Sequence, residues 1–163
     1  MAAWVVRTGS LTAALRRRFG AGFTVRLRDE GWRVPALEEA QRLRLPARQR
    51  AWVREVALCG WNRPVILARS VIPAASLIGA NRALTRLGTT PLGDLLFAGR
   101  GTERSAMEVA RLRPDDWLAR RLLADAVSSS GPLWARRVVH RLHRRPLLVT
   151  EVFLPHLLEG VDE

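Results

Sequence analysis

The chain has 163 residues, 48% of them hydrophobic and 26% charged, which is the composition of a globular protein with one sizeable core. Its formal net charge is +12, and all 27 basic residues are arginines because lysine is absent. No run approaches the ~18 apolar residues of a spanning helix, and the single cysteine, Cys59, excludes an internal disulfide.

Two function classes receive little support from this composition. The charge alone would allow a nucleic-acid binder, but the arginines are dispersed and no aromatic stacking motif accompanies them. His140, His143 and His156 lie near the C-terminus, and the first two are spaced i,i+3 with no carboxylate or cysteine beside them. We therefore expect neither a nucleic-acid partner nor a metal. The Arg-rich, acid-free first 28 residues faintly resemble a transit peptide, yet an ordinary first helix and a cytoplasmic protein are favoured.

The first half of the chain predicts one helix and three strands. Residues 10–20 form a helix that Ser10 caps and Gly20 ends. Residues 23–28 alternate as a strand that ends in a turn at 29–31, and residues 33–49 are irregular or partly helical. "AWVREVALC" and "RPVILARSVIP" are two strands of a hairpin that turns at "GWNR".

The second half predicts two short helices, a strand, a longer helix and a final hairpin. Residues 79–87 and "TTPLGDLLF" form a helix-turn-helix, in which Thr90 caps the second helix and Pro91 takes its first position. "GTERSAMEVARLR" is a strand, and "PDDWLARRLLADAV" is an amphipathic helix. "LWARRVVHRL" and "PLLVTEVFLP" close the chain as a hairpin. This order predicts a single α+β domain, residues 1–163, with an antiparallel sheet.

Three charged residues interrupt apolar rows on these strands. With a period of two, Arg54, Arg69 and Glu151 each share a strand face with large apolar side chains. A charge in such a place is costly unless it is paired. If the three converge, two cations and one anion line a dry site that would bind an anionic ligand. Arginines that extend their stems to solvent, or one buried Arg–Glu pair, would account for them as well.

Five strings, in order, resemble one enzyme family: "WVREVALC", "ARSVIP", "LGTTPLG", "LWARR" and "PLLVTEVFLP". Together they are similar to chorismate lyase, which forms 4-hydroxybenzoate and pyruvate from chorismate in the first committed step of ubiquinone synthesis. The resemblance runs from about Ser10 to Pro155. It implies a six-stranded antiparallel sheet, with helix-turn-helix flaps over an internal ligand pocket.

The resemblance also implies roles for five residues. Arg54 would bind the ring carboxylate, Arg69 the second carboxylate, and Glu151 the ring hydroxyl, with Arg54 and Glu151 as the catalytic pair. Leu92 would contact ligand from a flap. Leu11 would contact ligand from the first helix, at a position where a member of that family carries methionine.

The chemistry implied by the resemblance needs no cofactor, since loss of pyruvate makes the ring aromatic. Chorismate and 4-hydroxybenzoate would be the ligands of a protein that we expect to be monomeric. Residues 112–132 are an insertion relative to the family, with no role that the sequence reveals. The competing interpretation is a sensing domain of the same fold that binds an aromatic acid without converting it.

Overall fold

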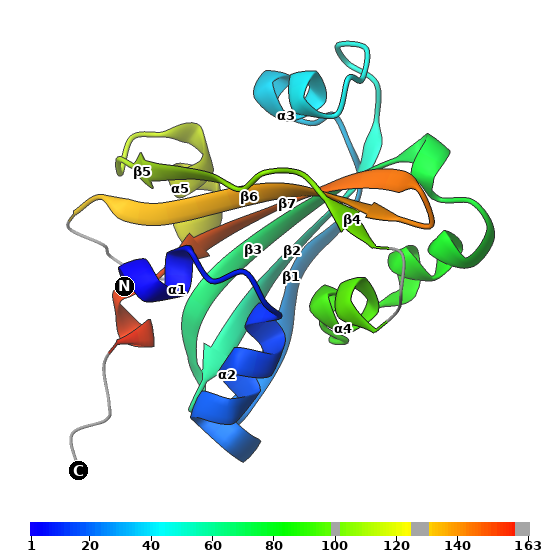
Figure 1. Cartoon of the computed structure of the whole chain (residues 1–163). Coiled ribbons are helices and arrows are strands. Elements are labelled where there is room, and N and C mark those ends of the chain that lie inside the picture. Colours follow the sequence, from blue (N-terminus) through cyan, green and yellow to red (C-terminus); the bar gives the residue numbers. More distant parts are fainter. Residues whose placement is uncertain (99–101, 125–130, 159–163) are drawn as a thin grey trace.

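The computed structural model describes residues 1–98, 102–124 and 131–158. Its centre is one antiparallel sheet of seven strands in the order β1-β2-β3-β7-β6-β4, with β5 also paired to β6 (Figure 1). The predicted α+β class is confirmed. The sheet has seven strands instead of about six because the single strand expected after residue 101 is divided in two. β4 (Glu103–Arg104) and β5 (Glu108–Leu112) pair with successive parts of β6.

Two tight hairpins form the middle of the sheet. β2 (Ala51–Gly60) and β3 (Arg63–Pro73) are joined by Trp61 and Asn62, whose φ angles are 46° and 68°. β6 (Leu133–Leu142) and β7 (Arg145–Phe153) are joined by two residues with φ angles of 50° and 64°. Two consecutive positive φ angles are typical of the turns that match the twist of a hairpin. Both predicted hairpins are confirmed.

β1 (Phe23–Arg33) is longer than the sequence predicts. A turn at residues 29–31 is wrong, because the strand continues past Arg28 and stays paired with β2. The pairing shifts by one residue between Leu27 and Asp29. Such a bulge lets polar residues that favour turns remain inside a strand.

Helices cover both faces of the sheet (Figure 1). α1 (Ala2–Val5), α2 (Leu11–Phe19), the 3₁₀ helix η3 (Gly79–Arg86) and α4 (Leu92–Phe97) pack on one face, which we call the inner face. α3 (Leu37–Arg42) and α5 (Trp117–Leu123) lie over the opposite, outer face. Short 3₁₀ turns complete the chain at Gly20–Gly22, Ala74–Ser76 and Pro155–Leu157. In the described part of the chain, no helix has the length and apolarity to cross a membrane.

The helix ends predicted from the sequence are confirmed for α2 but not for α4. Ser10 caps α2, since its Oγ accepts a hydrogen bond of 3.1 Å from the Ala13 amide, and Gly20 ends the helix. The predicted start of α4 is wrong by one residue: Pro91 is the capping residue, and the helix begins at Leu92.

A bulge in β3 determines which face of the sheet each of its side chains occupies. From the turn outward Gly60 pairs with Arg63 and Cys59 with Pro64, but Leu58 then pairs with Ile66, so Val65 is an extra residue. One extra residue moves every following side chain to the other face of the sheet. Proline cannot donate a hydrogen bond to a strand ladder, which makes a bulge beside Pro64 physically reasonable.

Candidate functional site

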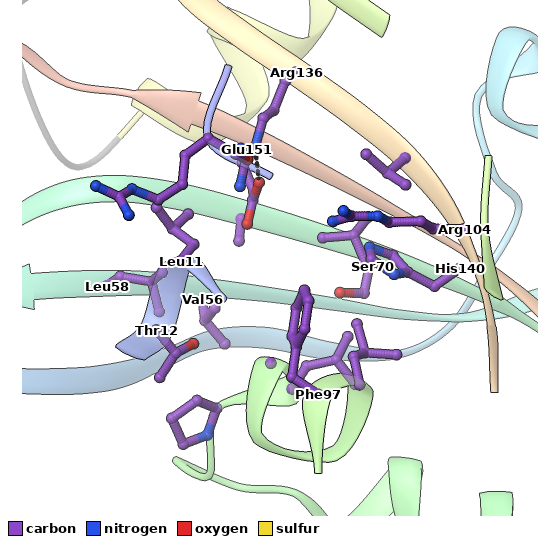
Figure 2. Close-up of a pocket in the computed structure, with 18 of the residues that line it drawn as sticks. Leu11, Thr12, Val56, Leu58, Ser70, Phe97, Arg104, Arg136, His140 and Glu151 are labelled. Atoms are coloured by element: carbon purple, nitrogen blue, oxygen red, sulfur yellow. Dashed lines mark hydrogen bonds and ion pairs between the residues drawn. The ribbon is translucent and has the colours of Figure 1, made fainter. Parts of the chain in front are cut away.

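A hollow lies between the inner face of the sheet and the helices α2 and α4 (Figure 2). It encloses about 750 Å³ that no atom fills, part of it open to solvent. Its floor comes from β2, β3, β6 and β7, and its cover comes from the segment before α2, α2 itself and α4. A pocket under helical elements was the expectation, and the structure has one.

Arg54 lines this hollow as an uncompensated buried cation. The residue is 2% exposed, and its Nη2 donates to the carbonyl oxygens of Gly88 at 2.8 Å and Thr90 at 3.0 Å. Nε is buried without a hydrogen-bond partner, and within the described ranges no carboxylate lies within ion-pair distance. Desolvation lowers the pKa of its guanidinium, although Glu30 across the strand pair opposes this. An anion entering the hollow would supply the missing charge.

Glu151 lies in the same hollow, paired with an arginine that the sequence analysis missed. Arg136 Nε donates to Glu151 Oε2 at 2.5 Å, and Nη1 donates to the carbonyl oxygens of Val5 and Arg7 (Figure 2). The side chains are 7% and 16% exposed, respectively. The hairpin register could have revealed this pair: a two-residue turn at 143–144 places Arg136 directly opposite Glu151.

The expectation that Arg69 shares a hollow with Arg54 is wrong. Because of the bulge, Arg54 faces Ser70 and Arg69 faces Glu55, so the two guanidinium groups lie on opposite sides of the sheet. Arg69 is 6% exposed on the outer face, where it bonds Glu39 at 2.7 Å and Glu55 at 2.6 Å. Those acids raise its pKa against the opposing effect of burial. Two carboxylates already satisfy this cation, which therefore joins α3 to the sheet.

The two predicted apolar contacts lie in the cover of the hollow. Leu11 begins α2 and Leu92 begins α4, and they are 5% and 7% exposed. The two helices approach closely where Gly93 meets Thr12: a Cβ added at Gly93 would lie 2.6 Å from Thr12 Oγ1. The glycine thus permits the contact that closes the hollow between Leu11 and Leu92.

A second polar group in the hollow also escaped the sequence analysis. His140 on β6 stands directly opposite Arg104 on β4, and both line the cavity (Figure 2). Burial lowers the pKa of His140 to about 4, with further effects of Arg104 and Arg136. The imidazole is therefore neutral near pH 7. The sequence had drawn attention only to its i,i+3 spacing from His143, whose Nδ1 lies 2.7 Å from Asn81 Oδ1.

Comparisons with known proteins identify the family. The family model described as chorismate lyase matches residues 1–162. The chain belongs to the chorismate lyase family. A relative from Methylococcus capsulatus (strain Bath), named "Probable chorismate pyruvate-lyase", is 44% identical over 97% of this chain and 96% of its own. "Chorismate pyruvate-lyase" from Yersinia enterocolitica is 44% identical over 72% of this chain and 58% of that protein.

Solved structures share the fold of this chorismate lyase family member at low sequence identity. A GntR-family transcriptional regulator from Bacillus cereus has a TM-score of 0.61 and 14% identity, over 87% of this chain and 98% of that one. The C-terminal domain of the histidine utilization repressor from Pseudomonas syringae has a TM-score of 0.60 and 14% identity, over 86% and 99%. At such identity the likeness concerns the fold alone. The chorismate lyase assignment rests on sequence.

Proposed function

We propose that the chain converts chorismate to 4-hydroxybenzoate and pyruvate in the inner-face hollow. Membership of the chorismate lyase family supports the reaction. The observation that carries the choice of site is Arg54: a cation 2% exposed with no carboxylate partner in the described part of the chain. A buried charge of this kind is unfavourable until an anion pairs with it. The family's product feeds ubiquinone synthesis, of which this reaction is the first committed step.

Arg54 binds the ring carboxylate in this proposal. Its Nη2 is oriented by two carbonyl oxygens of the segment that precedes α4, which positions the guanidinium before substrate arrives. A carboxylate can accept two parallel hydrogen bonds from a guanidinium, which fixes direction as well as distance. Binding would thus orient the ring and withdraw it from water at the same time.

Glu151 holds the other end of the ring, at the hydroxyl on C4. Arg136 occupies Oε2 of Glu151, which leaves Oε1 to accept a hydrogen bond from substrate. In the reaction the bond between C3 and the ether oxygen breaks and the proton on C4 is lost, so the ring becomes aromatic. The released enolpyruvate takes up a proton to become pyruvate. The C4 proton goes either to Glu151 or to the departing enolpyruvyl group, and Glu151→Gln distinguishes the two.

Leu11 and Leu92 supply the apolar cover in this proposal. Both line the hollow from the helices that cover it, and we expect movement of those helices to limit the release of product. The remaining inferences from the sequence stay predictions: a monomer in the cytoplasm, one domain over 1–163, and an insertion at 112–132. Residues 125–130 of the insertion lie outside the described residues. Size-exclusion chromatography with light scattering tests the monomer.

The deciding experiment is incubation of the purified chain with chorismate while the absorbance of 4-hydroxybenzoate is followed. Formation of 4-hydroxybenzoate with equimolar pyruvate is the expected result. The sensing-domain alternative predicts binding of an aromatic acid without conversion. Binding with no product formed would overturn the proposed activity and favour that alternative.

A further inference from the structure

A dianionic substrate needs a second cation besides Arg54. Chorismate carries a second carboxylate on its enolpyruvyl ether, and Arg69 is on the wrong face of the sheet and already paired with Glu39 and Glu55. This inference rests on the proposed function. Another of the cations that line the hollow must then receive the second carboxylate.

Three further arginines line the hollow: Arg7, Arg104 and Arg136. Arg136 is engaged on several sides, because Nε binds Glu151 and Nη1 binds two main-chain carbonyl oxygens. The Arg7 guanidinium lies 5.3 Å from the centre of the Trp4 ring, an exposed position at the N-terminal segment. Arg104 donates to the carbonyl oxygen of Thr8, and it has no carboxylate partner among the residues that the structure describes. Arg7 and Arg104 therefore both keep donors free for a ligand, and of the two only Arg104 is the strand partner of a buried polar residue that lines the hollow, His140.

His140 adds a polar group beside Arg104. The two residues are direct partners between β4 and β6, and His140 is 8% exposed. Within the described ranges no hydrogen bond to its ring nitrogens is found. The ring meets Phe97 of α4 edge-on, at 6.3 Å between centroids, which holds it against the cover of the hollow. A neutral imidazole carries one N–H, which can donate to a carboxylate oxygen.

The shape of chorismate selects this side of the hollow. The ring carboxylate and the C4 hydroxyl lie at opposite ends of the ring, so Arg54 and Glu151 fix its long axis. The enolpyruvyl ether on C3 must then extend to one side of that axis. Figure 2 shows Leu11, Val56 and Leu58 together on one side and Ser70, Arg104 and His140 together on the other. Burying a carboxylate directly against Leu11, Val56 and Leu58 would be strongly unfavourable.

The two cations come from different parts of the sheet. β2, which carries Arg54, and β4, which carries Arg104, are four positions apart in the sheet, and both arginines line the hollow. Arg104 is exposed and Arg54 is buried, so the two cations lie at the rim and at the base of the hollow.

We propose that Arg104 and His140 bind the enolpyruvyl carboxylate of chorismate at the rim of the hollow, while Arg54 binds the ring carboxylate at its base. The pair is then specific for substrate over product, because 4-hydroxybenzoate lacks the second carboxylate. Pyruvate, formed at the rim, has a shorter path to solvent than the aromatic product held beneath α2 and α4.

The test compares two ligands that differ in this carboxylate. We would measure the KM for chorismate and the Kd for 4-hydroxybenzoate, the latter by calorimetry, in the variants Arg104→Gln and His140→Leu. The loss of a hydrogen bond to a charged group predicts a KM for chorismate raised roughly tenfold or more. The Kd for 4-hydroxybenzoate should stay within about twofold of wild type. Unchanged product binding also shows that each variant is folded.

Arg141→Gln is the matched control. Arg141 follows His140 on β6, is exposed and does not line the hollow, so this variant removes one positive charge without touching the site. It should leave both constants unchanged. The proposal is overturned if Arg104→Gln and His140→Leu leave the KM for chorismate unchanged, or if they weaken both ligands equally. A wild-type chain that fails to form 4-hydroxybenzoate would instead overturn the proposed function.

Discussion

Replacing Arg54 with methionine, and Arg69 with methionine as its control, separates the functional arginine from the structural one. The two residues lie on neighbouring strands at similar burial, 2% and 6% exposed, but on opposite faces of the sheet. Methionine keeps an unbranched stem of similar packing and removes the charge. The two substitutions are therefore chemically the same, and only their surroundings differ.

The structure predicts opposite results for the two variants. Arg54→Met removes the cation that would pair with a desolvated carboxylate, so we expect a loss of about 2–5 kcal/mol in transition-state stabilisation. That corresponds to a fall in kcat/KM of roughly 30-fold to several thousand-fold. Arg69→Met leaves Glu39 buried without its arginine and leaves Glu55 with Arg121 alone, and breaking such a buried pair costs about 3–5 kcal/mol of folding stability. For a chain of this size Tm should fall by roughly 6–20 °C.

The assays are initial-rate kinetics with chorismate and thermal unfolding of both variants. Kinetics are measured well below the Tm of Arg69→Met, so that both proteins are folded. We expect Arg54→Met to have a Tm close to wild type and Arg69→Met to have a kcat/KM close to wild type. Normal kinetics in Arg54→Met would refute the role of Arg54. A kinetic defect in folded Arg69→Met as large as that of Arg54→Met would refute the separation of the two faces.

Four further outcomes follow from the site. Because Arg136 already donates to Glu151, we expect Glu151 to serve by hydrogen bonding, so Glu151→Gln should keep kcat within about tenfold of wild type; a fall of 10²–10⁴ in initial-rate kinetics would show that it accepts the proton. The pKa of His140 is about 4 in the folded chain against 6.5 for the free side chain, so the unfolded state binds a proton first and stability falls as pH drops from 6.5 to 4. This contribution, on the order of 3 kcal/mol, should be missing from His140→Leu when urea unfolding is compared at pH 7 and pH 4.5, and an equal loss in both proteins would contradict it. Gly93→Ala should raise the KM for chorismate several-fold and lower the free energy of unfolding by about 1–3 kcal/mol, because the new Cβ would lie 2.6 Å from Thr12 Oγ1. Adding Thr12→Ala should reverse both effects. If the double variant shows no reversal, the clash is not the cause. Finally, 4-hydroxybenzoate should bind tightly and inhibit, since its escape requires the cover to open; a calorimetric titration without heat at millimolar product would speak against this.

Much of the candidate site could be predicted from the strings that resemble the family. Arg54, Glu151, Leu11 and Leu92 all line one hollow, which agrees with the positions carried over from the resemblance. His140 was noticed only for its i,i+3 spacing. Its importance comes from neighbours on other elements: Arg104 from β4 and Phe97 from α4. No local pattern in "RVVHRL" indicates those contacts.

Arg136 is an intermediate case. The tight turn at residues 143–144 was recognisable, and counting back from it pairs Arg136 with Glu151. The interpretation of Glu151 as an acid in need of a partner was sound, but the partner was sought on the other hairpin. The residue pairing of two strands joined by a short turn can be predicted from the sequence, provided that neither strand contains a bulge.

The sequence by itself determined the two hairpins, the alternation of side chains along each strand and the family to which the chain belongs. The hairpins and the alternation follow from short-range physics, namely short turns between strands and a period of two along each strand. The family follows from the resemblance of five strings and from the family match over residues 1–162. Only the tertiary structure decided which face each row occupies. One extra residue at Val65 turns Arg69 away from Arg54 and toward Glu39 and Glu55. A bulge inserts only one residue, yet it turns every later side chain of the strand to the opposite face of the sheet. The ion pairs that stabilise Arg69 on that face come from acids on other segments of the chain.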